Sequence, residues 1–415
     1  MDKSRTKGNL LFVIFWWLVQ KLHIEWAHTL LYWGLRDGAF PAASPPDAIL
    51  HTDRWGYHFD TPIGLTDGID KRGNVLDTLL QMGFSFGSFG PYTLEKELPP
   101  REKYFLKQDK AVIVQCAGYR NPGLLKVLPW LIKRRYLPHF MGVDIAIPAE
   151  NEESNIKQER HFTYVEEFTL MAQRAAPYCD YLTLDFSHPN SELCLLVVNE
   201  STILPIIKAA KDAMAQAAPI KTPKIFVKIP LDLNAKEVPL VAKTLLDGEV
   251  DGVVVAGPMS LAKNSRIKLK DVKEFQYSGM LTGNPTHPYL TELIRRLYSI
   301  LKGRIPIIAS GFVADADAAF ELITAGANYI ALEDNCLVYQ GPGILQKVNK
   351  GLTELLKQKN FASLNDAVGS DIEQLEDTNP NPPQGMNPGI SNGMENCNPP
   401  PVTDSTIGVS STKTP

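Results

Sequence analysis

The sequence has few cysteines, no excess of positive charge and no long apolar run. Among 415 residues there are five cysteines and no Cys-x-x-Cys pair. We therefore expect neither a disulfide framework nor a metal site, and a reducing compartment is the expected environment. The net charge of −4 gives no sign of the basic surface that nucleic acids require, so no nucleic-acid partner is expected.

The amino-terminal segment, residues 1–45, has the pattern of helices that associate with a membrane. The apolar run 10–19 follows basic residues, but it is roughly half as long as a transmembrane helix needs to be. Farther along, Trp26, Leu30 and Trp33 fall near one helical face, and tryptophan favours the headgroup region. We predict helices that lie at the membrane surface. A true span or signal anchor and a buried core helix are the alternatives.

Residues 46–360 alternate strand-like with helix-like segments. Eight such units predict a (β/α)₈ barrel, and an open doubly wound sheet is the alternative. That alternative lacks the Gly-x-Gly-x-x-Gly turn after the first strand. The strand-like runs end near Thr66, Phe89, Ile147, Phe186, Ile229, Ala256, Ser310 and Leu332.

Residues 361–415 are rich in proline, asparagine, serine and threonine. The prolines of 379–383 and 399–401 can neither continue a helix nor pair in a central strand. Few bulky apolar residues are available to offset the entropy of the chain, so we predict a disordered tail.

Two polar residues at the predicted strand ends are candidates for chemistry. Lys228 interrupts the apolar run 225–229, either because it extends to solvent or because it contacts an anion or an electron-accepting group. His188 follows the fourth predicted strand, and it is either a hydrogen-bonding residue or a general base at neutral pH. Asp144 and Asp185 could orient this imidazole or raise its pKa.

The order and spacing of several motifs make the chain resemble one family from about Trp26 to Leu356. It resembles, as a divergent member, the membrane-associated, quinone-dependent (class 2) dihydroorotate dehydrogenases. That resemblance implies FMN, oxidation of dihydroorotate to orotate in pyrimidine biosynthesis, a membrane quinone as acceptor, and a peripheral location on the cytoplasmic face of the inner membrane. The motifs are Gly64-Leu65, Gly68, Asp70-Lys71, Gly118-Tyr119, Ser187 to Asn190, Val227-Lys228-Ile229, Thr282-Gly283 and Gly341-Pro342.

The same resemblance assigns roles to individual residues. His188 occupies the position of the catalytic base, and Asn190 and Ser191 match part of the substrate-binding loop. The positions that match cofactor contacts are Gly68, Lys71, Lys228, Gly283 and Gly311, with the last two near the flavin phosphate.

The chain departs from the family pattern at several of these positions. The family has a serine where this chain has His188, and an alanine where it has Asp67. Family asparagines that hold flavin or orotate match Asp144, Asp185 and Gly257. Asparagine both donates and accepts hydrogen bonds, whereas an ionised aspartate only accepts them.

Two functions therefore remain open. The first is a dihydroorotate dehydrogenase-like flavin oxidoreductase that acts on a dihydropyrimidine, with His188 as base. The second is a catalytically inactive, membrane-tethered barrel that serves as a binding or scaffold protein. A lyase that uses Lys228 as a Schiff-base amine has no separate support in the sequence.

Overall fold

The computed structural model describes most of the chain between residues 24 and 372. The run 10–19, Lys71, Asn190, Ser191 and the tail beyond residue 372 lie outside the described residues. The described residues are 24–36, 45–68, 70, 75–97, 103–107, 112–116, 119, 121–134, 140–148, 162–188, 194, 196–260, 280–333, 336–337, 340–341 and 343–372.

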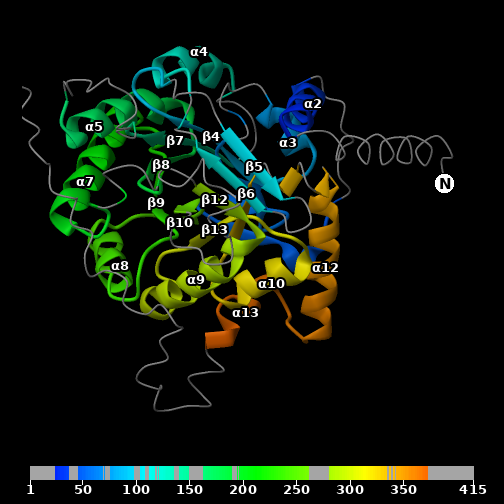
Figure 1. The fold of residues 1–415 in the computed structure, drawn as a ribbon. Helices are drawn as coiled ribbons and strands as arrows, with labels where there is room; N and C mark the ends of the chain where they lie inside the picture. Colours follow the sequence, from blue (N-terminus) through cyan, green and yellow to red (C-terminus); the bar gives the residue numbers. More distant parts are fainter. Residues whose placement is uncertain are drawn as a thin grey trace, which may run out of the picture. The chain divides into compact units, whose positions relative to one another are not determined.

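Eight parallel strands close into a barrel in the order β10-β13-β14-β3-β4-β7-β8-β9 (Figure 1). This arrangement confirms the predicted (β/α)₈ barrel, and every strand ends within three residues of its predicted end. The strands are β3 (Ile63–Leu65), β4 (Phe86–Tyr92), β7 (Phe140–Ala146), β8 (Tyr181–Asp185), β9 (Lys224–Pro230), β10 (Gly252–Ala256), β13 (Ile307–Gly311) and β14 (Tyr329–Leu332).

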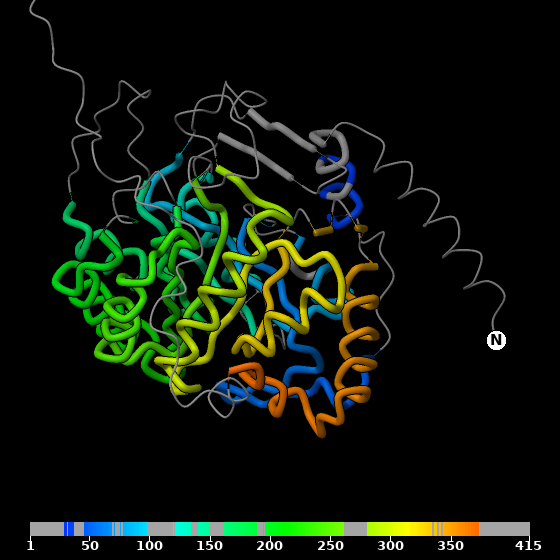
Figure 2. The backbone as a smooth tube through the Cα atoms, turned by 60° about the horizontal axis from the view of Figure 1, so that its bottom comes forward, coloured from blue at the N-terminus to red at the C-terminus, as the bar shows by residue number. Residues whose placement is uncertain are grey.

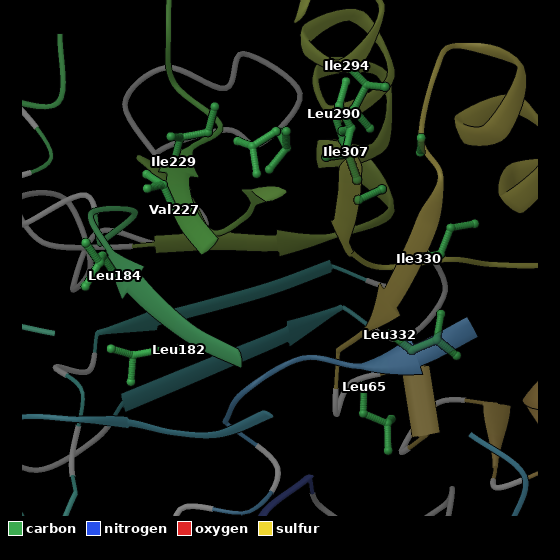
Figure 3. Close-up of a cluster of buried hydrophobic side chains, with 14 of the residues drawn as sticks. Leu65, Leu182, Leu184, Val227, Ile229, Leu290, Ile294, Ile307, Ile330 and Leu332 are labelled. Carbon is green, nitrogen blue, oxygen red and sulfur yellow. The ribbon is translucent and has the colours of Figure 1, made fainter. Parts of the chain in front are cut away.

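Helices follow the barrel strands and cover their outer face. Figure 3 shows Leu290 and Ile294 of α9 beside Ile307 of β13, and all three side chains are buried. Each such side chain contributes about 1.5–3 kcal/mol by leaving water. The helices are α3 (Leu76–Gln81), α4 (Leu124–Arg134), α5 (Tyr164–Ala175), α7 (Glu200–Ala217), α8 (Val238–Asp247), α9 (His287–Leu301), α10 (Ala316–Thr324) and α12 (Ile344–Gln358).

Polar side chains in the sequence fix where two of these helices begin. Thr163 and Glu166 form a capping box at the start of α5, in which each side chain binds the backbone N–H of the other residue. Asp315 accepts a hydrogen bond from the backbone N–H of Ala318 at the start of α10.

An antiparallel hairpin closes the amino-terminal end of the barrel. It consists of β1 (Thr52–Arg54) and β2 (Tyr57–Phe59), which follow the short helix η1 (Ala48–Leu50). At its turn Trp55 stacks on Phe140, the first residue of β7, with ring centroids 5.2 Å apart. The barrel interior at this end is therefore filled with aromatic side chains rather than solvent.

A second sheet is built from two excursions at the carboxyl end of the barrel. Its order is β11-β12-β6-β5, and the chain enters it after β4 and again after β10. Neighbouring strands are antiparallel. This sheet was not predicted, because each of its strands is a short insertion between barrel units. The strands are β5 (Lys103–Lys107), β6 (Val112–Cys116), β11 (Met259–Ser260) and β12 (Met280–Gly283).

The amino-terminal extension is helical in its described part, as predicted. Leu35 of α2 (Ile24–Arg36) is buried, whereas Leu30 and Trp33 are exposed, Trp33 by 53%. The guanidinium carbon of Arg36 lies 4.6 Å from the centroid of the Trp33 ring. Within the described part of the chain, no helix is both long enough and apolar enough to cross a membrane.

The predicted start of the tail is wrong, because residues 361–372 pack against the barrel helices. Helix α13 (Leu364–Ala367) buries its two terminal apolar residues, and the backbone N–H of Gly369 donates to the carbonyl of Ile323 in α10 at 3.1 Å. Figure 2 shows this orange segment beside the yellow helices. A few buried apolar residues are enough to anchor residues 361–372. The prediction failed because it rested on the average composition of the whole segment 361–415. The prediction for 373–415 lies outside the described residues.

Candidate functional site

Four ionisable side chains meet at the carboxyl ends of neighbouring barrel strands. Asp144 lies on β7, Asp185 ends β8, Lys228 lies on β9, and Asp67 follows β3. Asp185 and Lys228 are partners in the β8–β9 register, so their side chains leave the sheet side by side. This end of a (β/α)₈ barrel is where active sites are built, and we call these four residues the mouth cluster.

Three carboxylates surround the Lys228 ammonium. Its Nζ lies 2.5 Å from Asp67 Oδ1, 3.2 Å from Asp185 Oδ2 and 4.0 Å from Asp144 Oδ2. None of the four side chains is more than 7% exposed. Lys228 therefore does not reach solvent, and the anions that it contacts are carboxylates of the protein itself.

The protonation states of the mouth cluster follow from burial and from these distances. Burial and the neighbouring Asp67 charge raise the pKa of Asp144 well above its usual range, which favours the protonated, neutral form of Asp144. Burial alone would raise the pKa of Asp67, but the Lys228 ammonium lowers it below its usual value. Burial alone would lower the pKa of Lys228, but Asp185 and Asp67 raise it. The ammonium is therefore permanently charged.

Neighbouring hydroxyl and backbone groups hold the two remaining carboxylates in place. Asp67 Oδ1 accepts a hydrogen bond from Thr66 Oγ1 at 2.8 Å, and Ser310 Oγ donates to Thr66 Oγ1. Asp185 Oδ1 accepts from the backbone N–H and from the hydroxyl of Ser187, at 2.8 and 2.7 Å. These contacts to Asp185 all come from donors, which is the pattern of an ionised carboxylate. These two carboxylates outnumber the single ammonium, so the mouth cluster carries net negative charge.

Among the described residues, two buried side-chain oxygen atoms at the mouth cluster have no hydrogen-bond partner. They are Asp144 Oδ1 and Thr183 Oγ1, and the two residues are register partners across β7 and β8. An unpaired buried carboxylate oxygen costs more than an unpaired carboxyl oxygen, because the charged form loses more hydration. The geometry therefore agrees with a protonated Asp144.

His188 lies close to the mouth cluster and is buried. Its ring packs on Tyr119, with centroids 4.8 Å apart and planes tilted by 54°. Burial and the charge of Asp185 raise the pKa of Tyr119 well above its usual value, so the phenol stays neutral. The role of His188 as a base stays a prediction, as do the roles of Asn190 and Ser191.

Three of the predicted cofactor-binding glycines fall in the described part of the chain. Gly68 has a φ of +101°, and its backbone N–H donates to the carbonyl of Gly90 at 2.8 Å. Gly311 ends β13, where an added Cβ would lie 2.9 Å from a methyl group of Leu290. Gly283 ends β12 in the second sheet and has a φ of +99°. Their contact with a cofactor, like that of Lys71, stays a prediction.

Sequence reasoning found the members of the mouth cluster but not their pairing. Lys228 was matched to a flavin contact, whereas the structure joins it to Asp67, which lies 161 residues away in the chain. Tyr119 was noted only as part of a motif, and no local pattern connects it with His188. The one feature of the sequence that predicted their proximity was the position of each residue near the end of a strand, because all strand ends meet at the same edge of the barrel.

The fold and the strand-end residues agree with one protein family. The sequence model of dihydroorotate dehydrogenase matches residues 49–356. The chain belongs to the dihydroorotate dehydrogenase family. A quinone-dependent dihydroorotate dehydrogenase of Parvibaculum lavamentivorans is 30% identical over 357 residues, which cover 86% of this chain and 97% of that protein. The mitochondrial quinone-dependent enzyme of Oryza sativa is 26% identical over 381 residues, covering 85% and 78%.

Solved structures agree with this assignment. The ligand-free dihydroorotate dehydrogenase of Eimeria tenella has a TM-score of 0.73 and 26% identity, and covers 84% of this chain and 99% of its own. The structure of the Eimeria protein with ferulenol has a TM-score of 0.71 and 25% identity, with 84% and 95% covered.

The family depends on FMN, and the described mouth residues do not fit this cofactor. The pyrimidine edge of a flavin presents two carbonyl oxygens beside one N–H group and gains negative charge on reduction, so it needs mainly donors and cations. Asp67 and Asp185 offer acceptors only, and Lys228 already donates to both of them. These carboxylates are therefore suited to neutralising Lys228 within the protein rather than to holding an electron-rich ring.

Proposed function

We propose that this chain is a dihydroorotate dehydrogenase-family barrel that has lost the flavin-dependent reaction and acts as a membrane-associated binding or scaffold protein. One observation carries the proposal: the Lys228 ammonium is paired with the buried carboxylates of Asp67 and Asp185. A lysine in this state has no unbalanced charge to offer to a cofactor or to an anionic substrate.

The net charge of the mouth cluster supports the same proposal. Orotate and dihydroorotate are anions, and FMN carries a phosphate of about −1.5 to −2 charges. One uncompensated carboxylate at about 4 Å, with an effective dielectric constant of about 20, disfavours an anion by about 4 kcal/mol. That energy corresponds to about a thousandfold loss of affinity. We therefore expect the mouth to select neutral or cationic small molecules over anions.

Helix α2 supports membrane association. Leu30 and Trp33 are exposed on it, and Arg36 lies over the Trp33 ring. An apolar and aromatic face with a neighbouring cation is typical of a helix at a lipid headgroup layer. A peripheral location on the cytoplasmic face of the inner membrane is the corresponding prediction, and protease accessibility of the membrane fraction tests it.

The absorption spectrum of the full-length protein tests the loss of flavin. The protein is purified in mild detergent from cells supplied with riboflavin, and bound flavin is released with acid and quantified. We expect a folded protein with less than one tenth of a flavin per chain. Near-stoichiometric FMN would show that the proposal is wrong.

A charge-reduced variant tests the reason for the loss. Asp67→Ala combined with Asp185→Asn removes both ionised partners of Lys228, and the matched control Asp247→Asn removes an exposed carboxylate on α8 that pairs with Lys243. We expect FMN affinity to rise at least tenfold in the double variant only. Equal affinity in both proteins would refute the electrostatic explanation.

The family reaction, oxidation of dihydroorotate with a quinone acceptor, is the second candidate. Lys228 remains charged at the barrel mouth, and His188 packs on Tyr119, which favours this candidate. The relatives named above carry the same activity in their names. Dihydroorotate-dependent quinone reduction that is lost in His188→Ala would establish it, and no turnover in the presence of added FMN would exclude it.

A further inference from the structure

A cluster of histidine and aspartate side chains lies on the hairpin at the opposite end of the barrel from the mouth cluster. His51 precedes β1, His58 lies on β2 and Asp60 follows β2. One ligand atom of each residue lies within 4.8 Å of the ligand atoms of the other two. The rings of His51 and His58 meet edge to face, with centroids 5.1 Å apart. Two imidazoles and one carboxylate thus converge on one point.

A fourth residue fixes the orientation of one imidazole. His58 Nδ1 lies 2.8 Å from Asp53 Oδ1, and a carboxylate can only accept, so Nδ1 carries the proton. In the neutral ring the lone pair then belongs to Nε2, which faces Asp60. A carboxylate that orients a histidine through its second nitrogen is the usual outer partner of a metal-binding histidine.

The separation of the two ligand atoms suits a tetrahedral metal ion. His58 Nε2 and Asp60 Oδ1 are 3.5 Å apart. Two ligands at about 2.05 Å from a tetrahedral zinc ion lie about 3.3 Å from each other. His51 completes a set of three protein ligands, and water can take the fourth position. Asp60 is 64% exposed at its side chain and His58 53%, so small rotations can close the remaining distances.

We propose that His51, His58 and Asp60 form a binding site for Zn²⁺, with Asp53 as the residue that positions His58. Two imidazoles favour a borderline-soft ion such as zinc over magnesium or calcium, which prefer oxygen ligands. The side chains of His58 and Asp60 are exposed, so the ion can enter from solvent. The site is independent of the proposed loss of flavin.

Zinc at this site would fasten the hairpin that closes the barrel. His51 and Asp60 stand at the two ends of the hairpin, whose Trp55 and Phe59 pack into the aromatic interior of the barrel. A ligand that binds the folded state alone raises stability with its concentration. The midpoint of thermal unfolding should therefore rise as zinc is added.

Zinc titration of the metal-free, full-length protein without an affinity tag tests the proposal. Competition with a chromophoric chelator gives the stoichiometry and the affinity, and magnesium serves as the control ion. We expect one zinc per chain that His51→Ala with His58→Ala abolishes, and a rise in the unfolding midpoint that the same variant loses. Unchanged zinc binding in the double variant, or no binding to the wild type, would overturn the proposal.

Two further variants separate ligation from general effects on the fold. Asp53→Asn should weaken zinc binding about 10- to 100-fold, because it weakens the contact that orients His58. The control His287→Ala removes a histidine that pairs with Glu321 on α10, far along the chain from the hairpin, and should leave zinc binding unchanged. Equal loss of binding in His287→Ala, or full retention in Asp53→Asn, would contradict the assignment.

Discussion

Replacing Lys228 by methionine removes the ammonium that faces the buried carboxylates of Asp67 and Asp185. At distances of 2.5 and 3.2 Å and an effective dielectric constant of about 20, the gross attractions are about 7 and 5 kcal/mol. Most of this is offset by the cost of desolvating the three ions. Leaving two buried carboxylates unpaired should lower the free energy of unfolding by about 3–5 kcal/mol at pH 7.

The assay is urea unfolding of the wild type and of Lys228→Met, followed by tryptophan fluorescence at several pH values. Without the ammonium, burial raises the pKa of Asp67 in the folded state above that of the unfolded chain. The cost is then greatest at neutral and alkaline pH, and it shrinks as the pH falls through the folded-state pKa. A pH-independent cost would indicate a packing defect instead.

Two matched proteins complete the test. Lys228→Met combined with Asp67→Asn and Asp185→Asn removes all three charges and should recover stability to within about 1 kcal/mol of the wild type. Lys243→Met removes an exposed lysine that pairs with Glu200 and should change stability by less than about 0.5 kcal/mol. If Lys228→Met alone costs less than about 1 kcal/mol, or if the triple variant is no better, the reasoning fails.

Other substitutions test the protonation states and the packing. Burial raises the folded-state pKa of Asp144, so the wild type loses stability as the pH rises above about 4, where the unfolded chain ionises first. Asp144→Asn removes this loss and should stabilise the protein increasingly over the same pH range. Asp67→Asn should instead destabilise the protein at neutral pH. Burial alone would raise the folded-state pKa of Asp67, but Lys228 lowers it, so the stabilising contribution of Asp67 is present above about pH 4 and is lost as the pH falls. Denaturant unfolding between pH 3 and 8 measures both, and equal pH profiles would count against these protonation states. Gly142→Ala would place a Cβ 2.1 Å from the ring of Tyr181 and should cost roughly 1–3 kcal/mol or more in the same assay, whereas an unchanged midpoint would mean that the ring can move away. Trp55→Ala should cost about 3 kcal/mol by removing the stacked ring at the closed end of the barrel, and a loss below about 1 kcal/mol would contradict this packing.

Part of the candidate site could be predicted from the sequence. Asp144, Asp185 and Lys228 each end or interrupt an apolar run, and the position of a residue at a strand end is a local property of the chain. The geometry of a parallel barrel then brings those ends to one edge. Which carboxylate pairs with the lysine depends on register and rotamer, and these are decided by packing.

The hairpin illustrates the same limit at the other end of the barrel. His51, His58 and Asp60 have no recognised zinc-ligand spacing in the sequence, and only the antiparallel pairing of β1 with β2 brings them together. Helix α13 was also missed, because its packing depends on contacts with helices that come earlier in the chain.

The eight strand–helix units could be predicted from the sequence, because periodicity, caps and apolar runs are local properties of each segment. The family could be recognised in the same way, through motifs spread over the whole barrel. The pairing of Lys228 with Asp67 and Asp185, and the raised pKa of Asp144, could be read only from the folded structure. Both depend on charges from distant segments of the chain that meet within a few ångströms in a buried space. The cost of desolvating a charge there makes its pKa and its stability depend on the partner that it finds.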